Sequence, residues 1–318
     1  MIEVKHLTKR YGERTAIEDV TFRVEKGEVL AFLGPNGAGK TTTMRILTGF
    51  LPATSGTATV AGFDVFDQPM EVKRSIGYLP ETPPLYNEMT VREFLTFVAK
   101  IKGVPKAARP GALSSVLERC GLTEVPGRLI GNLSRGYRQR VGLAQTLIHD
   151  PEVLILDEPT VGLDPKQIIE MRGLIKKLAG EHTVILSTHI LPEATAVCQR
   201  VVIIHEGRIR AVDSPEQLSS KLRQSEKVSL ILRQPSPQTS EVLRSLPDVL
   251  NVFEEPTSNG QVLVVEAQLG KDVREEVARC AVSHGWGLLE MKTVSMTLED
   301  VFLKLTQKER SEDPASPV

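Results

Sequence analysis

A glycine-rich segment directly after a short apolar run constrains this chain more than any other feature. Residues 29–33 are typical of a buried strand, and the residues after Thr41 have helical character as far as Gly49. Glycines let the backbone curl until successive amide N–H groups converge on one anion, while a lysine adds positive charge and a hydroxyl can bind Mg²⁺. We therefore predict an α/β fold with a nucleotide-phosphate loop made of Gly34, Pro35, Asn36, Gly37, Ala38, Gly39, Lys40, Thr41 and Thr42.

Composition excludes several classes of partner. Lysine and arginine number 39 against 40 aspartates and glutamates, and this net charge of −1 argues against a nucleic-acid partner. Three cysteines (Cys120, Cys198 and Cys280) show neither disulfide nor metal spacing, which is typical of a reducing compartment. Because no signal peptide and no run of about 20 apolar residues is present, we expect a soluble cytoplasmic protein that reaches a membrane only through a partner.

The apolar pattern predicts a parallel sheet in the first two thirds of the chain. Residues 153–156 and 183–187 are unbroken apolar runs, typical of strands buried on both faces. A third run, residues 201–204, leads into a hairpin-like turn at 205–207. Thr90 and Glu93 have the spacing of a capping box and predict the start of an amphipathic helix.

Beyond about residue 224 the pattern changes to β-α-β-β-α-β, the order of a small ferredoxin-like α+β unit, followed by one more helix. We predict a nucleotide-binding domain over residues 1–222, an accessory domain over 226–307 and a disordered tail over 308–318. The accessory domain groups no catalytic residue types, so regulation, dimerisation and partner contact all stay open as roles. Its predicted strands are 228–232, 249–253, 262–267 and 287–291, and its predicted helices are 239–246, 272–284 and 298–305.

Polar residues at strand and helix ends indicate the chemistry. Asp157 follows a buried strand, where Mg²⁺ finds a second anchor, and Glu158 can polarise an attacking water; the alternative is a pair of surface carboxylates. Ser134 and Gly136 begin a helix and so offer a second anion site. His189 follows another strand, a position that is more often structural than catalytic.

In their order along the chain, these segments closely resemble the nucleotide-binding subunits of ATP-binding-cassette (ABC) transporters, over roughly residues 1–220. The resemblance implies a P-loop NTPase fold: a RecA-like core, an antiparallel β subdomain and a helical subdomain near residues 85–150. It also implies that ATP and Mg²⁺ are the cofactors. Tyr11 would stack on adenine, Thr41 and Asp157 would hold Mg²⁺, Glu158 would be the general base, and His189 would contact the γ-phosphate.

The same resemblance implies a second ATPase subunit, as a homodimer or a heterodimer. Ser134 and Gly136 would reach the ATP bound on that subunit, and Asp164 would lie in the loop that joins the two active sites. The family's common pattern at this segment is Leu-Ser-Gly-Gly-Gln, whereas here Arg135 and Tyr137 replace glycine and glutamine. These replacements put the strength of the γ-phosphate contact in question.

A further departure lies in the sensing loop, where Glu81 replaces the family's glutamine; it could act on water or Mg²⁺, or be a solvated loop carboxylate. Taken together, these departures, residues 76–81 and the appended domain resemble those of the ATPases of ABC-2-type exporters, including gliding-motility and drug- or ion-export subunits. We therefore expect an ATPase on the inner face of the cell membrane that drives a separate permease, contacted through residues 83–87 unless these form an ordinary turn. An importer ATPase and a soluble, non-transport ABC ATPase are the alternatives.

Overall fold

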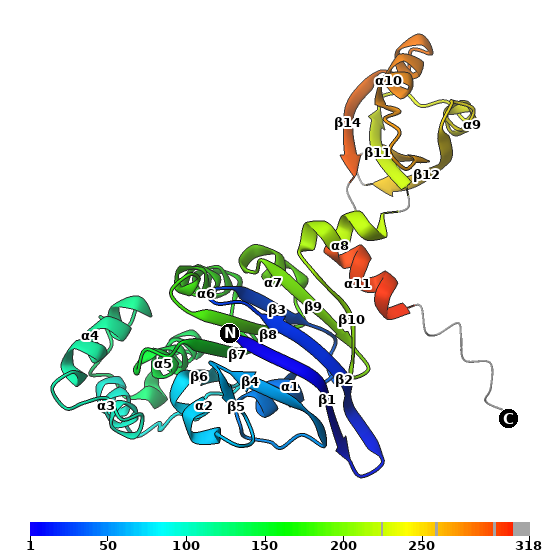
Figure 1. Ribbon diagram of the computed structural model, residues 1–318. Helices are drawn as coiled ribbons and strands as arrows, with labels where there is room; N and C mark the ends of the chain where they lie inside the picture. The colour runs from blue at the N-terminus through cyan, green and yellow to red at the C-terminus, as the bar shows by residue number, and fades with distance from the viewer. Residues whose placement is uncertain (224, 258–259, 295–296, 308–318) are drawn as a thin grey trace, which may run out of the picture. The chain divides into compact units, whose positions relative to one another are not determined.

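The computed structural model describes residues 1–223, 225–257, 260–294 and 297–307 (Figure 1). The chain divides into two compact units, Met1–Pro215 and Glu216–Val318. This division falls seven residues or more before the boundary predicted between residues 222 and 226, which stays a prediction. The tail predicted to be disordered, residues 308–318, lies outside the described residues.

A six-stranded sheet carries the functional segments of the first unit. Its strand order is β10-β9-β3-β8-β7-β6, and the pairs from β9 to β6 are all parallel. The two predicted apolar runs, β7 and β8, are fully buried parallel strands, as expected, and β9 turns into antiparallel β10. The bounds are β3 Val29–Leu33, β6 Ile76–Leu79, β7 Val153–Asp157, β8 Thr183–Thr188, β9 Arg200–His205 and β10 Arg208–Asp213.

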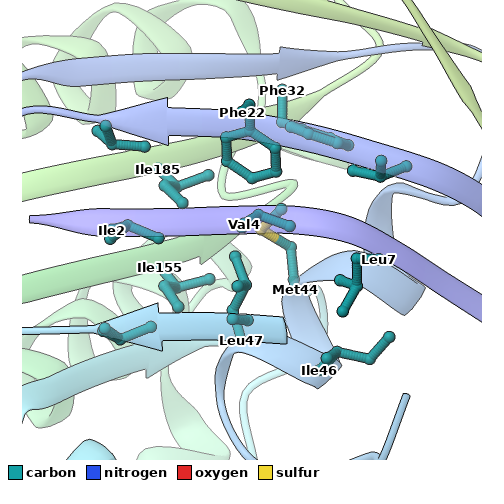
Figure 2. Close-up of a cluster of buried hydrophobic side chains, with 14 of the residues drawn as sticks. Ile2, Val4, Leu7, Phe22, Phe32, Met44, Ile46, Leu47, Ile155 and Ile185 are labelled. Atoms are coloured by element: carbon teal, nitrogen blue, oxygen red, sulfur yellow. The ribbon is translucent and has the colours of Figure 1, made fainter. Parts of the chain in front are cut away.

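A second, antiparallel sheet has the order β2-β1-β4-β5. Together with helix α1, it encloses the main hydrophobic core. Figure 2 shows Met44, Ile46 and Leu47 of α1 among apolar side chains of both sheets. The rings of Phe22 and Phe32 join the two sheets at a centroid distance of 5.4 Å. The bounds are β1 Ile2–Tyr11, β2 Arg14–Val24, α1 Lys40–Leu47, β4 Ser55–Val60 and β5 Phe63–Asp64.

Three helices form the predicted helical subdomain next to β6, at one edge of the parallel sheet (Figure 1). They are α3 (Val91–Ile101), α4 (Arg109–Arg119) and α5 (Arg135–Leu147). The capping box is confirmed: the Thr90 hydroxyl accepts from the Glu93 N–H, and the Glu93 carboxylate accepts from the Thr90 N–H at 2.9 Å. The remaining helices of this unit are α2 (Pro69–Ser75), the short 3₁₀ turn Ile130–Asn132, α6 (Pro165–Leu178) and α7 (Leu191–Val197).

The second unit contains an antiparallel sheet with the order β12-β13-β11-β14 and the predicted β-α-β-β-α-β sequence of elements. This strand order places each crossover helix between parallel outer and inner strands, as a split βαβ unit requires. Its core contains Trp286, the chain's only tryptophan. The bounds are α8 Pro215–Leu222, β11 Ser225–Leu232, α9 Thr239–Arg244, β12 Val249–Thr257, β13 Gly260–Gln268, α10 Arg274–Ser283, β14 Leu288–Val294 and α11 Leu298–Gln307.

The capping box gives the first testable prediction. Thr90→Ala removes the acceptor of a helix N–H, so we expect the first unit to lose about 1 kcal/mol of stability in urea unfolding followed by circular dichroism. Thr96→Ala, in the middle of the same helix, is the matched control and should cost nothing, because alanine favours helices. Trp286 fluorescence reports on the other unit as an internal reference. Equal unfolding midpoints for the two variants would contradict the prediction.

Candidate functional site

The backbone of the phosphate loop requires glycine at two positions. Gly37 and Gly39 have φ values of 82° and 107°, in the region that side chains disfavour. A Cβ on Gly39 would lie 2.5 Å from Cγ2 of Ile17 and 2.8 Å from the carbonyl oxygen of Ala16. The loop is therefore tightly seated against strand β2 at the start of α1.

A cavity of about 900 Å³ opens at this loop. It is lined by Asn36, Gly37, Gly39, Lys40, Thr41 and Thr42 of the predicted phosphate loop. Four further predicted residues from distant segments also line it: Tyr11, Glu81, Glu158 and His189. The structure thus places these residues around one cavity, although they are far apart in the sequence.

The other predicted loop residues have supporting positions. The carbonyl oxygens of Gly34 and Pro35 accept hydrogen bonds from Nζ of Lys40 at 2.8 and 3.2 Å, and Ala38 packs into the core. Tyr11 is half exposed, with Nζ of Lys9 at 5.2 Å from its ring centroid. A flat aromatic ring at the mouth of a cavity can stack on a base.

A chain of polar contacts runs along the cavity from the buried Lys40 and Glu158 to His189, whose side chain is 39% exposed. Nζ of Lys40 lies 3.2 Å from Oε1 of Glu158, and Oε2 of Glu158 lies 2.8 Å from Nδ1 of His189. Lys40 and Glu158 are 5% and 6% exposed, so this charge pair is screened little by solvent. Glu158 also has a φ of 50°, a strained value typical of residues held in place at functional sites. The alternative of a pair of surface carboxylates is wrong, because Asp157 and Glu158 are both buried.

Asp157 ends strand β7 one residue before Glu158 and is 1% exposed. Its Oδ1 has no hydrogen-bond partner among the residues that the structure describes. Burial and the Asp157 carboxylate raise the pKa of Tyr78 to about 12, so the phenol stays protonated near this negative charge. An orphaned carboxylate oxygen of this kind fits a cation.

Within the described ranges, no group of three or more His, Cys, Asp or Glu side chains could hold a metal by itself. A hard cation such as Mg²⁺ instead takes one or two protein oxygens and completes its shell with phosphate and water. Asp157 and the hydroxyl of Thr41, which lines the cavity, are suited to that arrangement.

Ser134 and Gly136 lie apart from this cavity. Ser134 is the N-cap of α5, and its hydroxyl accepts from the N–H of Tyr137. A Cβ on Gly136 would lie 2.6 Å from the Gln167 side chain. The N-terminus of α5 therefore packs against α6, whose own N-cap, Asp164, accepts from the Gln167 N–H at 2.9 Å.

Sequence reasoning missed several lining residues of the cavity. The turn between β9 and β10 reaches it because the Gly207 N–H donates to the Ala38 carbonyl, and the Gly207 carbonyl accepts from Glu18 N–H at 2.8 Å. The sequence indicated this turn, but a local pattern carries no signal that it docks on the phosphate loop. The missed residues are Arg14, Thr15, Ala16, Val161, Glu206 and Gly207.

Comparison with known proteins shows which family this chain resembles. The family model described as "ABC transporter" matches residues 17–161. The uncharacterized ABC transporter ATP-binding protein YxlF of Bacillus subtilis is 34% identical over 96% of this chain and 99% of its own length. The bacitracin transport ATP-binding protein BcrA of Bacillus licheniformis is 36% identical over 96% and 97%, respectively. The linearmycin resistance ATP-binding protein LnrL of Bacillus subtilis is 32% identical over 96% and 98%.

Solved structures agree with these sequence relatives. The structure of an ATP-binding subunit of an ABC transporter has a TM-score of 0.64 and 33% identity, covering 70% of this chain and 92% of that chain. A dimeric ATP-binding cassette, MJ0796, bound to ADP and Pi has a TM-score of 0.62 and 25% identity, covering 67% and 98%. No helix in the described part of the chain is both long and apolar enough to cross a membrane.

The close packing of the phosphate loop against β2 leads to the second prediction. Gly37→Ala should cost about 1–2 kcal/mol of stability, because it places a side chain at positive φ in open space. Gly39→Ala should cost about 1–3 kcal/mol more, because its Cβ also overlaps Ile17 and Ala16. Urea unfolding of the two variants measures the difference, and equal losses would show that the contact with β2 is unimportant.

Proposed function

The chain belongs to the family of ABC transporter ATP-binding proteins, and from this membership we propose that it powers an exporter. Relatives named for bacitracin transport and linearmycin resistance favour export over import and over a non-transport ATPase. The observation that carries the proposal is the contact chain at one cavity from the buried pair Lys40 and Glu158 to His189. ATP hydrolysis there supplies the free energy for transport.

Each part of the cavity has a role in this reaction. The loop amides and Lys40 bind the phosphates, and Tyr11 stacks on the base. Glu158 accepts a proton from the attacking water, while His189 orients the carboxylate and contacts the γ-phosphate. Mg²⁺, when held by Thr41 and Asp157, would neutralise charge on the phosphates.

Ser134 and Gly136 complete the site of a second subunit. Both lie outside the cavity of their own chain, at the N-terminus of the 13-residue helix α5, where backbone N–H groups favour an anion. Two subunits would close head to tail around two ATP molecules, and hydrolysis would remove the bridging phosphate and reopen the pair. A relative of known structure is dimeric, which supports this arrangement as a homodimer or a heterodimer.

A separate integral membrane permease would carry the substrate, and the ATPase would lie on the inner face of the cell membrane. The segment from Pro83 to Asn87 is our candidate contact. Tyr86 is 47% exposed, yet its ring packs edge-on against Phe94 and Phe97 at 6.0 and 5.8 Å. The rings hold this segment firmly on α3, so that force on it would move the helical subdomain.

The third prediction tests the general base. Glu158→Gln keeps the shape of the side chain but cannot take a proton, so we expect kcat for ATP hydrolysis to fall about 10²- to 10⁴-fold. ATP affinity, measured by equilibrium binding, should persist, and closed dimers should accumulate in size-exclusion chromatography with Mg·ATP. Wild-type turnover in this variant would overturn the assignment of Glu158.

The fourth prediction tests the partner. Tagged Glu158→Gln with Mg·ATP, used as bait on detergent-solubilised membranes of the native cell, should retain a stoichiometric protein with several membrane spans, identified by mass spectrometry. Lys40→Ala is the matched bait that should retain less, because it cannot hold the phosphates that close the dimer. Recovery of soluble or ribosomal proteins alone would favour the non-transport ATPase.

A further inference from the structure

A buried carboxylate lies behind the catalytic pair, outside the cavity. Glu193, on α7, is 1% exposed. Its Oε2 accepts a hydrogen bond from the Thr188 hydroxyl at 2.8 Å, and its Oε1 accepts one from the Thr160 hydroxyl. Thr160 and Thr188 are themselves 2% and 0% exposed, so water does not compete for these bonds.

The two threonines belong to the two segments that carry the catalytic pair. Thr160 comes two residues after Glu158, and Thr188 comes one residue before His189. One carboxylate therefore spans the turn that follows β7 and the end of β8. The same segments meet a second time where the Glu158 N–H donates to the Ser187 carbonyl at 2.9 Å.

Stability alone does not account for a charge at this position. Among the described residues, the cation within 4 Å of this carboxylate is the Arg172 guanidinium, whose Nη2 lies 3.8 Å from Oε1 of Glu193, a distance beyond a hydrogen bond. Buried ion pairs add little net stability over well-packed apolar residues. What the carboxylate supplies is two acceptors at fixed positions, each holding one hydroxyl.

We propose that Glu193 is a positioning residue for ATP hydrolysis, which holds the Glu158 turn and the His189 segment in register by binding Thr160 and Thr188. This inference rests on the proposed function, in which Glu158 is the base and His189 orients it. The contact between Oε2 of Glu158 and Nδ1 of His189, 2.8 Å long, joins side chains whose backbones Glu193 ties together. Among the described residues, the hydrogen bonds between Glu193 and the two threonine hydroxyls do not involve Tyr11 or the phosphate loop. The Gly34 N–H does donate to the Thr188 carbonyl at 3.3 Å, but this backbone bond does not use the Thr188 hydroxyl, so we expect substrate binding to change little when Glu193 is altered.

The test is Glu193→Gln in the full-length chain. Glutamine has the same shape, but an amide NH2 replaces one acceptor oxygen, so one threonine hydroxyl has to accept instead of donate. Both hydrogen bonds also lose the strength that the carboxylate charge gives them, so both segments are held less firmly. We expect kcat to fall about 10- to 100-fold, because misplacement of a catalytic group by a fraction of an ångström to about 1 Å costs that much. KM for ATP should stay within about 2-fold of the wild-type value.

Companion variants separate positioning from folding. Thr160→Val removes the hydroxyl that donates to Glu193 and should lower kcat in the same way, whereas Thr160→Ser keeps the hydroxyl and should restore the rate. Thr146→Val is the matched control, because Thr146 is a threonine of similar burial whose hydroxyl donates to the Leu143 carbonyl within α5. If Glu193→Gln fails to fold, the contrast between valine and serine at position 160 decides the question, and equal rates for both would overturn the inference.

A double variant distinguishes this inference from the proposed function. If Glu193 acts through Glu158, Glu193→Gln should add no further loss in the Glu158→Gln background. An equal fold-loss in both backgrounds, or a raised KM with unchanged kcat, would overturn the positioning role and leave the base intact. Wild-type turnover of Glu158→Gln would instead overturn the proposed function itself.

Discussion

The rest of this structure has to hold the buried side chains of Lys40 and Glu158 in contact. The two contacting atoms lie 3.2 Å apart, and both side chains are almost fully removed from water. Desolvation offsets most of their attraction, so the pair contributes little net stability. A frame made by other parts of the fold must therefore hold the two side chains in place. That frame is the parallel sheet, in which β8 separates β3 from β7 and the carboxyl ends of all three strands reach the same edge.

The hydrophobic core fixes the other half of this contact. Met44, Ile46 and Leu47 are fully buried along α1, and they prevent the helix from rotating about its axis (Figure 2). Lys40 is the first residue of that helix, so its direction follows from the packing of the turns behind it. On its other side, the phosphate loop packs at Gly39 against Ile17 of the antiparallel sheet. The second sheet thus serves the site although it contributes few polar groups.

Local patterns predicted much of this molecule, because strands, caps and the phosphate loop each depend on a few neighbouring residues. The capping box at Thr90 is confirmed for this reason, and the elements of the second unit follow one another in the predicted order. Long-range placements had no such signal. Nothing near residues 183–188 indicates that this strand inserts between β3 and β7, and nothing near Glu206 indicates that its turn docks on Ala38. No local pattern indicated the hydrogen bonds of Glu193, because its partners Thr160 and Thr188 are 33 and 5 residues away.

The departure at Arg135 has a structural explanation within the same chain. The family's glycine at this position is replaced by a long side chain, and its guanidinium lies where a Cβ on Gly162 would be 2.2 Å from Cζ. The absence of a side chain at Gly162 therefore provides the space that Arg135 fills. Ser134 caps α5, and Gly136 lies close to the Gln167 side chain at the start of the same helix. The Arg135 side chain thus fills the space between the start of α5 and the loop before α6, while the N-cap hydrogen bond of Ser134 is present.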